Sequence, residues 1–274
     1  MIEILLSTYN GELFLRQQLN SIVDQTYQEW EILIRDDGSC DNTISIINEY
    51  CERYPQKIKY ISNNKNIGCL HSYEALLQVS NAPYIMFCDQ DDVWMPDKIQ
   101  RTFNKMILVE ESHPDSPILI HTDLEVVDQN KKTIHSSFWK LSYINPYLLK
   151  EFNYLGVYNG ITGCSMMINK AAKNNALPFS ANARMHDSWI SLCVSKVGYI
   201  DYIENKTILY RQHEYNKIGV EKQLNPDYFR SKFLNMKNVI DENRLQLKML
   251  NDLHYGNILK YFIYKFLYII RSRV

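Results

Sequence analysis

Short apolar segments alternate with amphipathic ones through the first hundred residues, and this alternation constrains the fold more than any other feature of the sequence. Four apolar segments are typical of buried strands: Ile2–Leu6, "WEILIR", "KIKYIS" and "YIMFC". The segments between them carry apolar residues at helical spacing: Glu12–Gln25, "DNTISIINEYCERY" and "CLHSYEALLQVS". Strands that alternate with helices in this way predict an α/β fold, in which a parallel sheet has helices on both faces.

Polar side chains gather where three of these strands end. "STYNGE" follows the first strand, "RDDGS" the second and "CDQDD" the fourth. The carboxyl ends of parallel strands meet at one edge of a sheet, and open α/β sheets bind their ligands there. We therefore expect the three segments to converge and to form the functional site.

The most acidic of these segments places Asp89, Asp91 and Asp92 within four positions. Carboxylates this close raise one another's pKa unless a positive charge lies among them. A divalent cation that neutralises a diphosphate would supply that charge, because Mg²⁺ prefers carboxylate and phosphate oxygens. The alternative is a helix start, with Asp92 or Asp97 as the cap. Since three acids cannot all cap one helix, we expect at least one to bind metal or ligand.

Two further loops carry ligand-binding residue types, each with a plainer alternative. Asp36 and Asp37 can accept hydrogen bonds from a base or a ribose hydroxyl, but Gly38 beside them equally indicates a strand-to-helix turn. Asn66 and Gly68 precede a helix N-terminus, which suits an anionic ligand and also an ordinary loop.

The second half of the chain adds two candidates. Asp187 lies beside His186 where a helix begins, so it is either an N-cap or a general base for an attacking hydroxyl. His213 follows an apolar strand with Arg211 nearby, and it is either a satisfied polar residue or a ligand of metal or phosphate.

Beyond residue 112 the pattern becomes mixed. We expect strands at 117–128 and 160–170, a helix at 186–198, and one or two short strands within 199–213. From about residue 222 onward the spacing of apolar residues predicts helices.

Composition and charge exclude several classes. A formal net charge of −1 gives no reason to expect a nucleic acid partner. The six cysteines show no CxxC spacing, which favours reduced thiols in a cytoplasmic protein over a disulfide framework or a zinc site. The N-terminus lacks the basic region of a signal peptide, and no uncharged apolar run reaches the roughly 18 residues of a membrane span.

The C-terminal segment "NILKYFIYKFLYIIRSRV" mixes aliphatic and aromatic residues with lysines and arginines. Because Lys260 and Lys265 interrupt it, we do not expect it to span a bilayer. Two roles stay open: a helix lying in the interface of an anionic leaflet on the inner face of the cytoplasmic membrane, or a helix packed on the catalytic domain or on a partner subunit.

Seven motifs in order, "LLSTYNGE", "QTYQEWEILIRDDGSCDNT", "NKNIG", "FCDQDDVWMPDK", "TGCSMMINK", "HDSW" and "YRQHEYN", resemble the family 2 glycosyltransferases. Within that family the chain is similar to bacterial rhamnosyltransferases of surface polysaccharide synthesis, over residues 2–220. The resemblance implies a GT-A fold with a mixed, mainly parallel sheet. It divides the chain into a catalytic domain at 1–221, with a nucleotide-binding half (1–112) and an acceptor-binding half (113–221), and a helical appendage at 222–274.

The resemblance also implies an activity. The donor would be a nucleotide-diphospho-sugar, with dTDP-rhamnose favoured over a UDP-hexose. The acceptor would be a hydroxyl of a glycan or of a lipid-linked sugar, the cofactor Mg²⁺ or Mn²⁺, and the anomeric carbon would be inverted.

Carried over residue by residue, the resemblance gives each candidate a role. Asp187 matches the catalytic base, and Asp91 and His213 match metal-binding positions. The implied donor-binding residues are Ser7, Tyr9, Asn10, Asp37, Asn66, Gly68, Asp89 and Gln90. The implied acceptor or sugar contacts are Trp94, Gly163, Cys164, His186, Trp189 and Arg211. The chain departs from the family where His186 replaces the commoner Glu and where Ser188 replaces a tryptophan.

Two other functions are compatible with such a sheet. A carbohydrate- or nucleotide-binding module without turnover would have no need for both a metal ligand at Asp91 and a base at Asp187. A sugar-phosphate nucleotidyltransferase would carry a Gly-rich loop with Arg or Lys after its first strand, and "STYNGELFL" lacks one.

Overall fold

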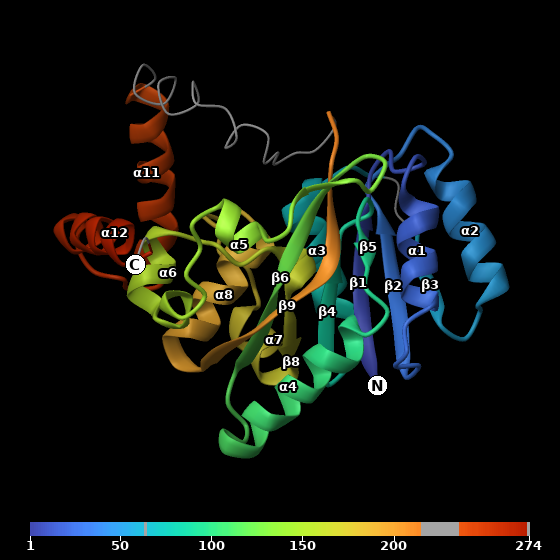
Figure 1. The fold of residues 1–274 in the computed structure, drawn as a ribbon, viewed down its shortest axis with the longest axis horizontal. Coiled ribbons are helices and arrows are strands. Elements are labelled where there is room, and N and C mark those ends of the chain that lie inside the picture. Colours follow the sequence, from blue (N-terminus) through green and yellow to red (C-terminus); the bar gives the residue numbers. More distant parts are fainter. Residues whose placement is uncertain (63–64, 215–235, 273–274) are drawn as a thin grey trace.

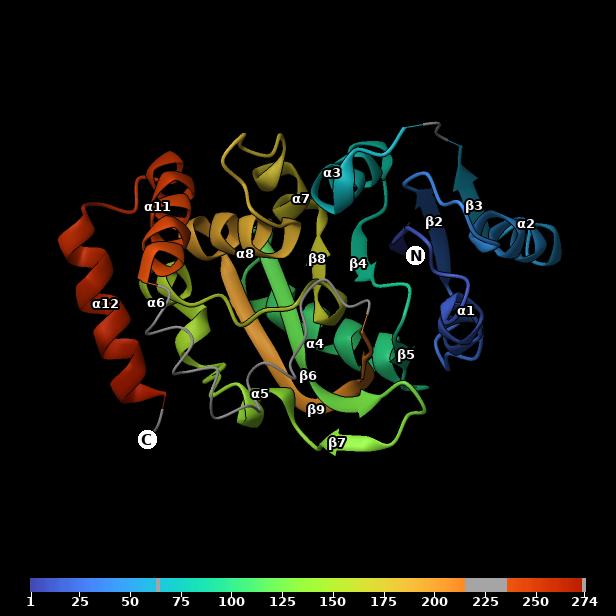
Figure 2. The same ribbon diagram turned by 90° about the horizontal axis from the view of Figure 1, so that it is seen from above.

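The computed structural model describes residues 1–62, 65–214 and 236–272. Within these ranges one mixed sheet of nine strands has the order β3-β2-β1-β4-β8-β6-β9-β5, and β7 pairs with β6. The strands are β1 Ile2–Thr8, β2 Trp30–Asp36, β3 Ile58–Ile61, β4 Tyr84–Cys88, β5 Val93–Trp94, β6 Ile118–Asp128, β7 Thr133–His135, β8 Met167–Asn169 and β9 Tyr199–Gln212. Helices cover both faces of the sheet (Figures 1 and 2).

The three helices predicted between the first four strands are present, and further helices follow them along the chain. They are α1 Leu15–Val23, α2 Thr43–Arg53, α3 Gly68–Val79, α4 Lys98–Ser112, α5 Phe138–Leu141, α6 Phe152–Val157, α7 Lys170–Ala176, α8 His186–Val197, α11 Met236–Asp252 and α12 Ile258–Arg271. Two short 3₁₀ helices, η1 Leu148–Lys150 and η2 Gly163–Ser165, lie in the second half.

The first half of the sheet confirms the predicted parallel arrangement. β1 pairs in parallel with β2 on one side and with β4 on the other, so that Ile4 lies between Ile32 and Met86. Successive strand residues point to opposite faces. One face packs on α1, α2 and α4, and the other on α3, α7 and α8, as Figure 2 shows from above. Burial on both faces explains why these strands are apolar throughout.

The second half differs from the prediction in two strands. The segment 160–170 forms η2 followed by β8, a strand of only three residues that runs antiparallel to both β4 and β6. The segment 199–213 forms one strand of 14 residues, β9, which is longer than the one or two short strands expected. Its register against β6 shifts so that Thr122 pairs with Ile203 but Asp123 pairs with Lys206. This bulge exposes the polar stretch 204–206 that interrupts the apolar pattern.

The C-terminal helices pack on the rest of the protein. Tyr261 and Tyr268 of α12 are buried and belong to the same apolar cluster as Leu155 of α6. The boundary predicted at 221/222 lies outside the described residues. The described helices 236–252 and 258–271 agree with the helical reading of this region.

Arg211, near the end of β9, ties the site edge of the sheet together. The residue is only 1% exposed. Its Nε donates to the carbonyl of Asp91 at 2.7 Å, and its Nη2 donates to Oε1 of Gln17 in α1 at 2.9 Å. Its backbone N–H donates to Oδ1 of Asp92 at 3.0 Å, and its guanidinium lies 4.5 Å from the centre of the Phe14 ring. Arg211 therefore fixes the acidic loop after β4 against α1.

We expect Arg211→Met to lower the free energy of unfolding by about 3 kcal/mol. The change leaves buried hydrogen-bond acceptors without a donor and removes a positive charge beside buried carboxylates. Urea unfolding of the purified protein measures this. Arg16→Met is the matched control, since Arg16 forms a half-exposed ion pair with Glu49 and its loss should leave the urea midpoint almost unchanged. Equal stabilities of the two variants would contradict the role given to Arg211.

Candidate functional site

The loops after β1, β2 and β4 contact one another, which confirms the predicted convergence at the sheet edge. Gln90 accepts from the backbone N–H of Tyr9 at 2.8 Å and donates to its carbonyl at 3.0 Å. The backbone N–H of Asn10 donates to Oγ of Ser39 at 2.8 Å. A Cβ on Gly11 would lie 2.4 Å from Oε1 of Gln90, so a larger residue here would displace the side chain that bonds Tyr9.

The side chain of Tyr9 is half exposed above this junction, where it is free to stack on a planar ligand. Ser7, in β1, pairs with Arg35 of β2. These two positions place the predicted base-binding residues at the same edge as the acidic loop.

Asp37 is held as a buried carboxylate beside the start of α3. Nη1 of Arg35 donates to it at 2.7 Å, and the backbone N–H groups of Ile67 and Gly68 donate at 2.8 Å each. Burial acts to raise the pKa of Asp37, but these donors outweigh it and the pKa is lowered. Two amides of the α3 N-terminus, predicted as an anion site, are thus occupied by Asp37, while the neighbouring Asn66 is exposed.

The acidic loop contains carboxyl groups with raised pKa values. Burial, with the charges of Asp91 and Asp187, raises the pKa of Asp89 to about 7. Burial, with the charges of Asp91 and Asp89, raises the pKa of Asp92 well above its usual range. Lys98 lies buried beneath the loop, and burial lowers its pKa to about 8. Buried cations from the chain itself therefore offset part of the repulsion among the acids.

Asp91 and His213 meet at the mouth of the site. Nε2 of His213 lies 3.0 Å from Oδ2 of Asp91, although the two residues come from the β4–β5 loop and from the end of β9. The imidazole packs 4.8 Å from the Phe14 ring. A carboxylate beside an imidazole is a pair of ligands that a divalent cation can bind.

A second group of candidate ligands lies deeper. One ligand atom each from Asp89, Asp92 and Cys164 falls within 4.8 Å of the others. Burial and the nearby acids raise the pKa of the Cys164 thiol well above its usual range, so the sulfur stays protonated. A protonated thiol is a poor ligand for a hard cation. The Asp91–His213 pair fits Mg²⁺ or Mn²⁺ better.

Asp187 lies in the first turn of α8, one residue inside the helix, so the N-cap alternative does not describe it. Its Oδ2 accepts the backbone N–H of Gly163 at 3.2 Å. Burial raises the pKa of Asp187 to about 6, despite backbone donors that lower it. Its charge in turn contributes to the raised pKa of Asp89. The structure therefore brings a carboxyl group poised near neutral pH to the same site as the acidic loop.

Other residues predicted to contact the acceptor or the sugar lie in the interior of the protein. His186 stacks 3.9 Å from the Tyr73 ring and is buried, and burial lowers its pKa to about 3, so the ring is neutral. A Cβ on Gly163 would lie 2.3 Å from Nε2 of His186, so glycine makes room for it. Trp94 is buried beside Lys98, and the Trp189 indole N–H donates to the carbonyl of Ala176.

Three buried partners of the acids escaped the sequence prediction: Arg35, Tyr73 and Lys98. Tyr73 donates its hydroxyl to Asp89 at 3.2 Å from the middle of α3, where only tertiary packing places it. Arg35 and Lys98 do carry a signal, because each is a cation within a few residues of clustered acids in an otherwise apolar context.

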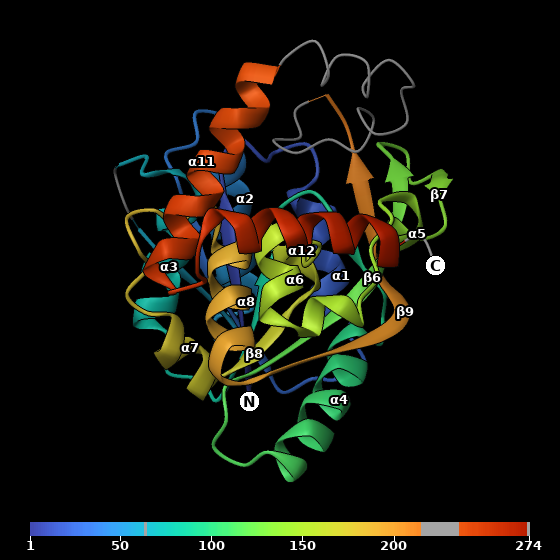
Figure 3. The ribbon, with the colours of Figure 1, turned by 90° about the vertical axis from the view of Figure 1, so that its left-hand side faces the viewer.

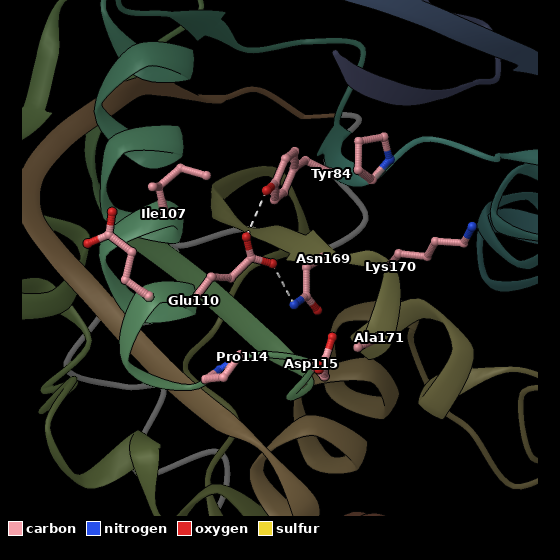
Figure 4. Close-up of a pocket in the computed structure, with 10 residues that line it drawn as sticks. Tyr84, Ile107, Glu110, Pro114, Asp115, Asn169, Lys170 and Ala171 are labelled. Carbon is pink, nitrogen blue, oxygen red and sulfur yellow. Dashed lines mark hydrogen bonds between the residues drawn. The ribbon is translucent and has the colours of Figure 1, made fainter.

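A pocket of about 460 Å³ lies at the opposite end of the strands (Figure 4). Tyr84, the first residue of β4, and Asn169, the last residue of β8, both line it and both donate to Glu110, at 2.7 and 2.9 Å. The site residues described above do not line this pocket, and three of its polar side chains, Tyr84, Glu110 and Asn169, bond to one another.

Comparison with known proteins places these features in a family. Residues 3–175 match the model of the family described as Glycosyl transferase family 2. The dTDP-rhamnosyl transferase RfbG of Shigella flexneri is 30% identical over 237 residues, which cover 82% of this chain and 77% of that protein. A UDP-Glc:alpha-D-GlcNAc-diphosphoundecaprenol beta-1,3-glucosyltransferase of Escherichia coli, WfgD, is 29% identical over 39% of this chain and 41% of its own.

Several other curated relatives are longer, and the matched stretch spans 57% to 66% of their length. Among solved structures, the mannosyltransferase PcManGT from Pyrobaculum calidifontis, in complex with GDP-Man and Mn²⁺, superposes with a TM-score of 0.59 at 13% identity and covers 99% of this chain and 85% of that one. The fold is GT-A, and the chain belongs to glycosyl transferase family 2.

Proposed function

We propose that this protein is an inverting, metal-dependent glycosyltransferase that moves a sugar from a nucleotide-diphospho-sugar to an acceptor hydroxyl. The observation that carries the proposal is that a candidate base and a candidate metal-binding pair lie at the same edge of the sheet. Asp187, whose pKa burial raises to about 6, shares the site with the Asp89–Asp91 loop and His213. Transfer of a sugar requires a base near a metal-binding pair, whereas binding of the donor alone does not require the base.

The donor would occupy the edge formed by the loops after β1, β2 and β4. The residues we assign to it are Ser7, Tyr9, Asn10, Asp37, Asn66, Gly68, Asp89 and Gln90. Asp91 and His213 would hold Mg²⁺ or Mn²⁺, which when bound neutralises charge on the diphosphate leaving group. The name of the Shigella relative favours dTDP-rhamnose as donor, with a UDP-hexose as the second candidate.

Asp187 acts as the general base. An acceptor hydroxyl has a pKa far above 7, so Asp187 takes its proton as the new C–O bond forms. The hydroxyl attacks the anomeric carbon from the side opposite the departing diphosphate, which inverts that carbon. The hydrogen bond from the backbone N–H of Gly163 holds the Asp187 carboxylate in place, and the neutral ring of His186 packs against Tyr73.

We assign residues 1–112 to donor binding, 113–221 to acceptor binding and 222–274 to a helical appendage. Gly163 and Cys164 lie beside Asp187 and Asp89 on the acceptor side. The name of the Escherichia coli relative supports a lipid-linked sugar as acceptor, in bacterial cell-surface polysaccharide synthesis. The reaction would then take place in the cytoplasm, at the inner face of the cytoplasmic membrane.

Replacing the base should separate binding from transfer. We expect Asp187→Asn to bind the donor normally and to lose about 10²- to 10⁴-fold in turnover, because the amide cannot accept the proton. Release of nucleoside diphosphate and titration calorimetry measure the two effects. Asp115→Asn, at the opposite end of the sheet, is the control and should keep full activity. A fully active Asp187→Asn would remove the proposed base.

The pH profile follows from the same carboxyl group. Since the protonated form of Asp187 cannot act as a base, kcat/KM should fall about tenfold per pH unit below pH 6 and level off above it. Donor binding is measured over the same range, because Asp89 titrates near pH 7 and can affect affinity. An unchanged rate at pH 4.5 would contradict the assignment.

Metal and donor should stabilise the wild-type protein together. In a thermal-shift panel of nucleoside diphosphates and their sugars, we expect a higher Tm in the presence of Mn²⁺ or Mg²⁺. Asp91→Ala and His213→Ala should lose the metal-dependent part of the shift. If no nucleoside diphosphate raises the Tm, the donor site is wrongly assigned. Release of pyrophosphate instead of nucleoside diphosphate would indicate a nucleotidyltransferase.

A further inference from the structure

Helix α12 presents a continuous apolar stripe to solvent. Seven of its side chains are between 48% and 66% exposed, and all seven are aliphatic or aromatic: Ile258, Leu259, Phe262, Ile263, Phe266, Ile269 and Ile270. At 100° per residue these positions fall on one face of the helix. Figure 3 shows α12 lying lengthwise across the surface. Contiguous exposed apolar surface of this kind marks an interaction site.

The opposite face of α12 fixes the helix on the protein. Tyr261 and Tyr268 are buried, and the Tyr268 ring stacks 4.7 Å from Tyr158. The Tyr261 hydroxyl donates to Asn243 of α11 at 2.9 Å. Because these contacts set the rotation of the helix, the apolar stripe is presented outward by the fold itself.

Basic residues flank the stripe on both sides. Lys265 lies along one edge, and Lys260 and Arg271 lie toward the other, with Nζ of Lys260 donating to the carbonyl of Tyr255 and Nη1 of Arg271 donating to the Tyr154 hydroxyl. From residue 258 to the end of the sequence there is no Asp or Glu. Apolar side chains bordered by cations complement a surface that is apolar inside and anionic outside.

We propose that the stripe on α12 docks on an anionic membrane surface, with the helix lying in the plane of the interface. The helix has 14 residues and is about 21 Å long, which is too short to cross the hydrocarbon core. No helix among the described residues has the length and apolar character of a membrane span.

A second copy of the chain fits this face less well than a membrane. A two-fold dimer through the stripe would place the same patch on both sides of the interface. The basic edges of the two copies would then approach each other with no acid in either stripe to separate them. Anionic lipid headgroups provide the missing negative charge.

The docking places the acceptor half nearer the membrane than the donor half. In Figure 1, α12 lies at one end of the molecule, and α2 and β3 of the nucleotide-binding half lie at the other. A nucleotide sugar would then approach from the aqueous side, while a lipid-linked acceptor reaches the site from the side of α12. This orientation rests on the proposed function, whereas the docking itself does not.

Vesicle flotation of the purified 274-residue protein tests the docking without any activity. We expect the protein to float with vesicles of phosphatidylcholine and phosphatidylglycerol (3:1) and to bind vesicles of phosphatidylcholine alone at least about tenfold more weakly. Phe262→Ser/Phe266→Ser should weaken binding to the anionic vesicles at least about tenfold. Leu108→Ser, which removes a 61% exposed leucine from α4, is the matched control and should bind as wild type does.

Two outcomes would overturn the proposal. Wild-type protein that stays with the aqueous fraction on anionic vesicles, while its Tm shows that it is folded, excludes membrane docking. A wild-type dimer in light scattering that Phe262→Ser/Phe266→Ser converts to a monomer would assign the stripe to a second copy. Nucleoside diphosphate release by the same double variant should match wild type with a soluble acceptor, so a loss of docking stays distinct from a loss of transfer.

Discussion

Three carboxyl groups can share one edge of this sheet because cations are buried beneath them. Arg211 bonds the carbonyl of Asp91 and, through its backbone, the side chain of Asp92, while Lys98 is enclosed under the same loop. Lys98 follows this loop by only a few residues, but Arg211 comes from the end of β9, so the loop after β4 acquires its shape only when β9 is in place. The geometry of the site therefore depends on completing the whole sheet.

The same burial sets the chemistry of the edge. Asp37 and Asp187 are both enclosed carboxyl groups, but Arg35 and two backbone amides lower the pKa of the first, whereas burial with weaker compensation raises that of the second to about 6. One acid is thus fixed as an anion, and the other is able to exchange a proton near neutral pH. Different partners, rather than a different residue type, therefore separate the carboxylate that we assign to donor binding from the proposed base.

The sequence predicted those parts of the fold that depend on local periodicity. The apolar strands β1 to β4 and the helices between them were expected, and so was their meeting at one edge, because both follow from alternation and strand direction. Strand β9 was expected as one or two short strands, since its register shift against β6 near Asp123 depends on the tertiary structure. Arg211 was expected to contact the acceptor or the sugar, and its buried position beneath Asp91 depends on contacts from three separate segments.

Helix α12 reverses the arrangement that water favours. A surface helix normally turns aliphatic side chains toward the core and polar ones outward. Here tyrosines, one of them hydrogen-bonded through its hydroxyl, hold the helix on α6 and α11, and isoleucines and phenylalanines face out. Exchanging the two faces would bury more apolar surface on folding, so this pattern does not maximise stability in water. It is the pattern expected if the outer face of α12 meets an apolar phase while the protein carries out its function.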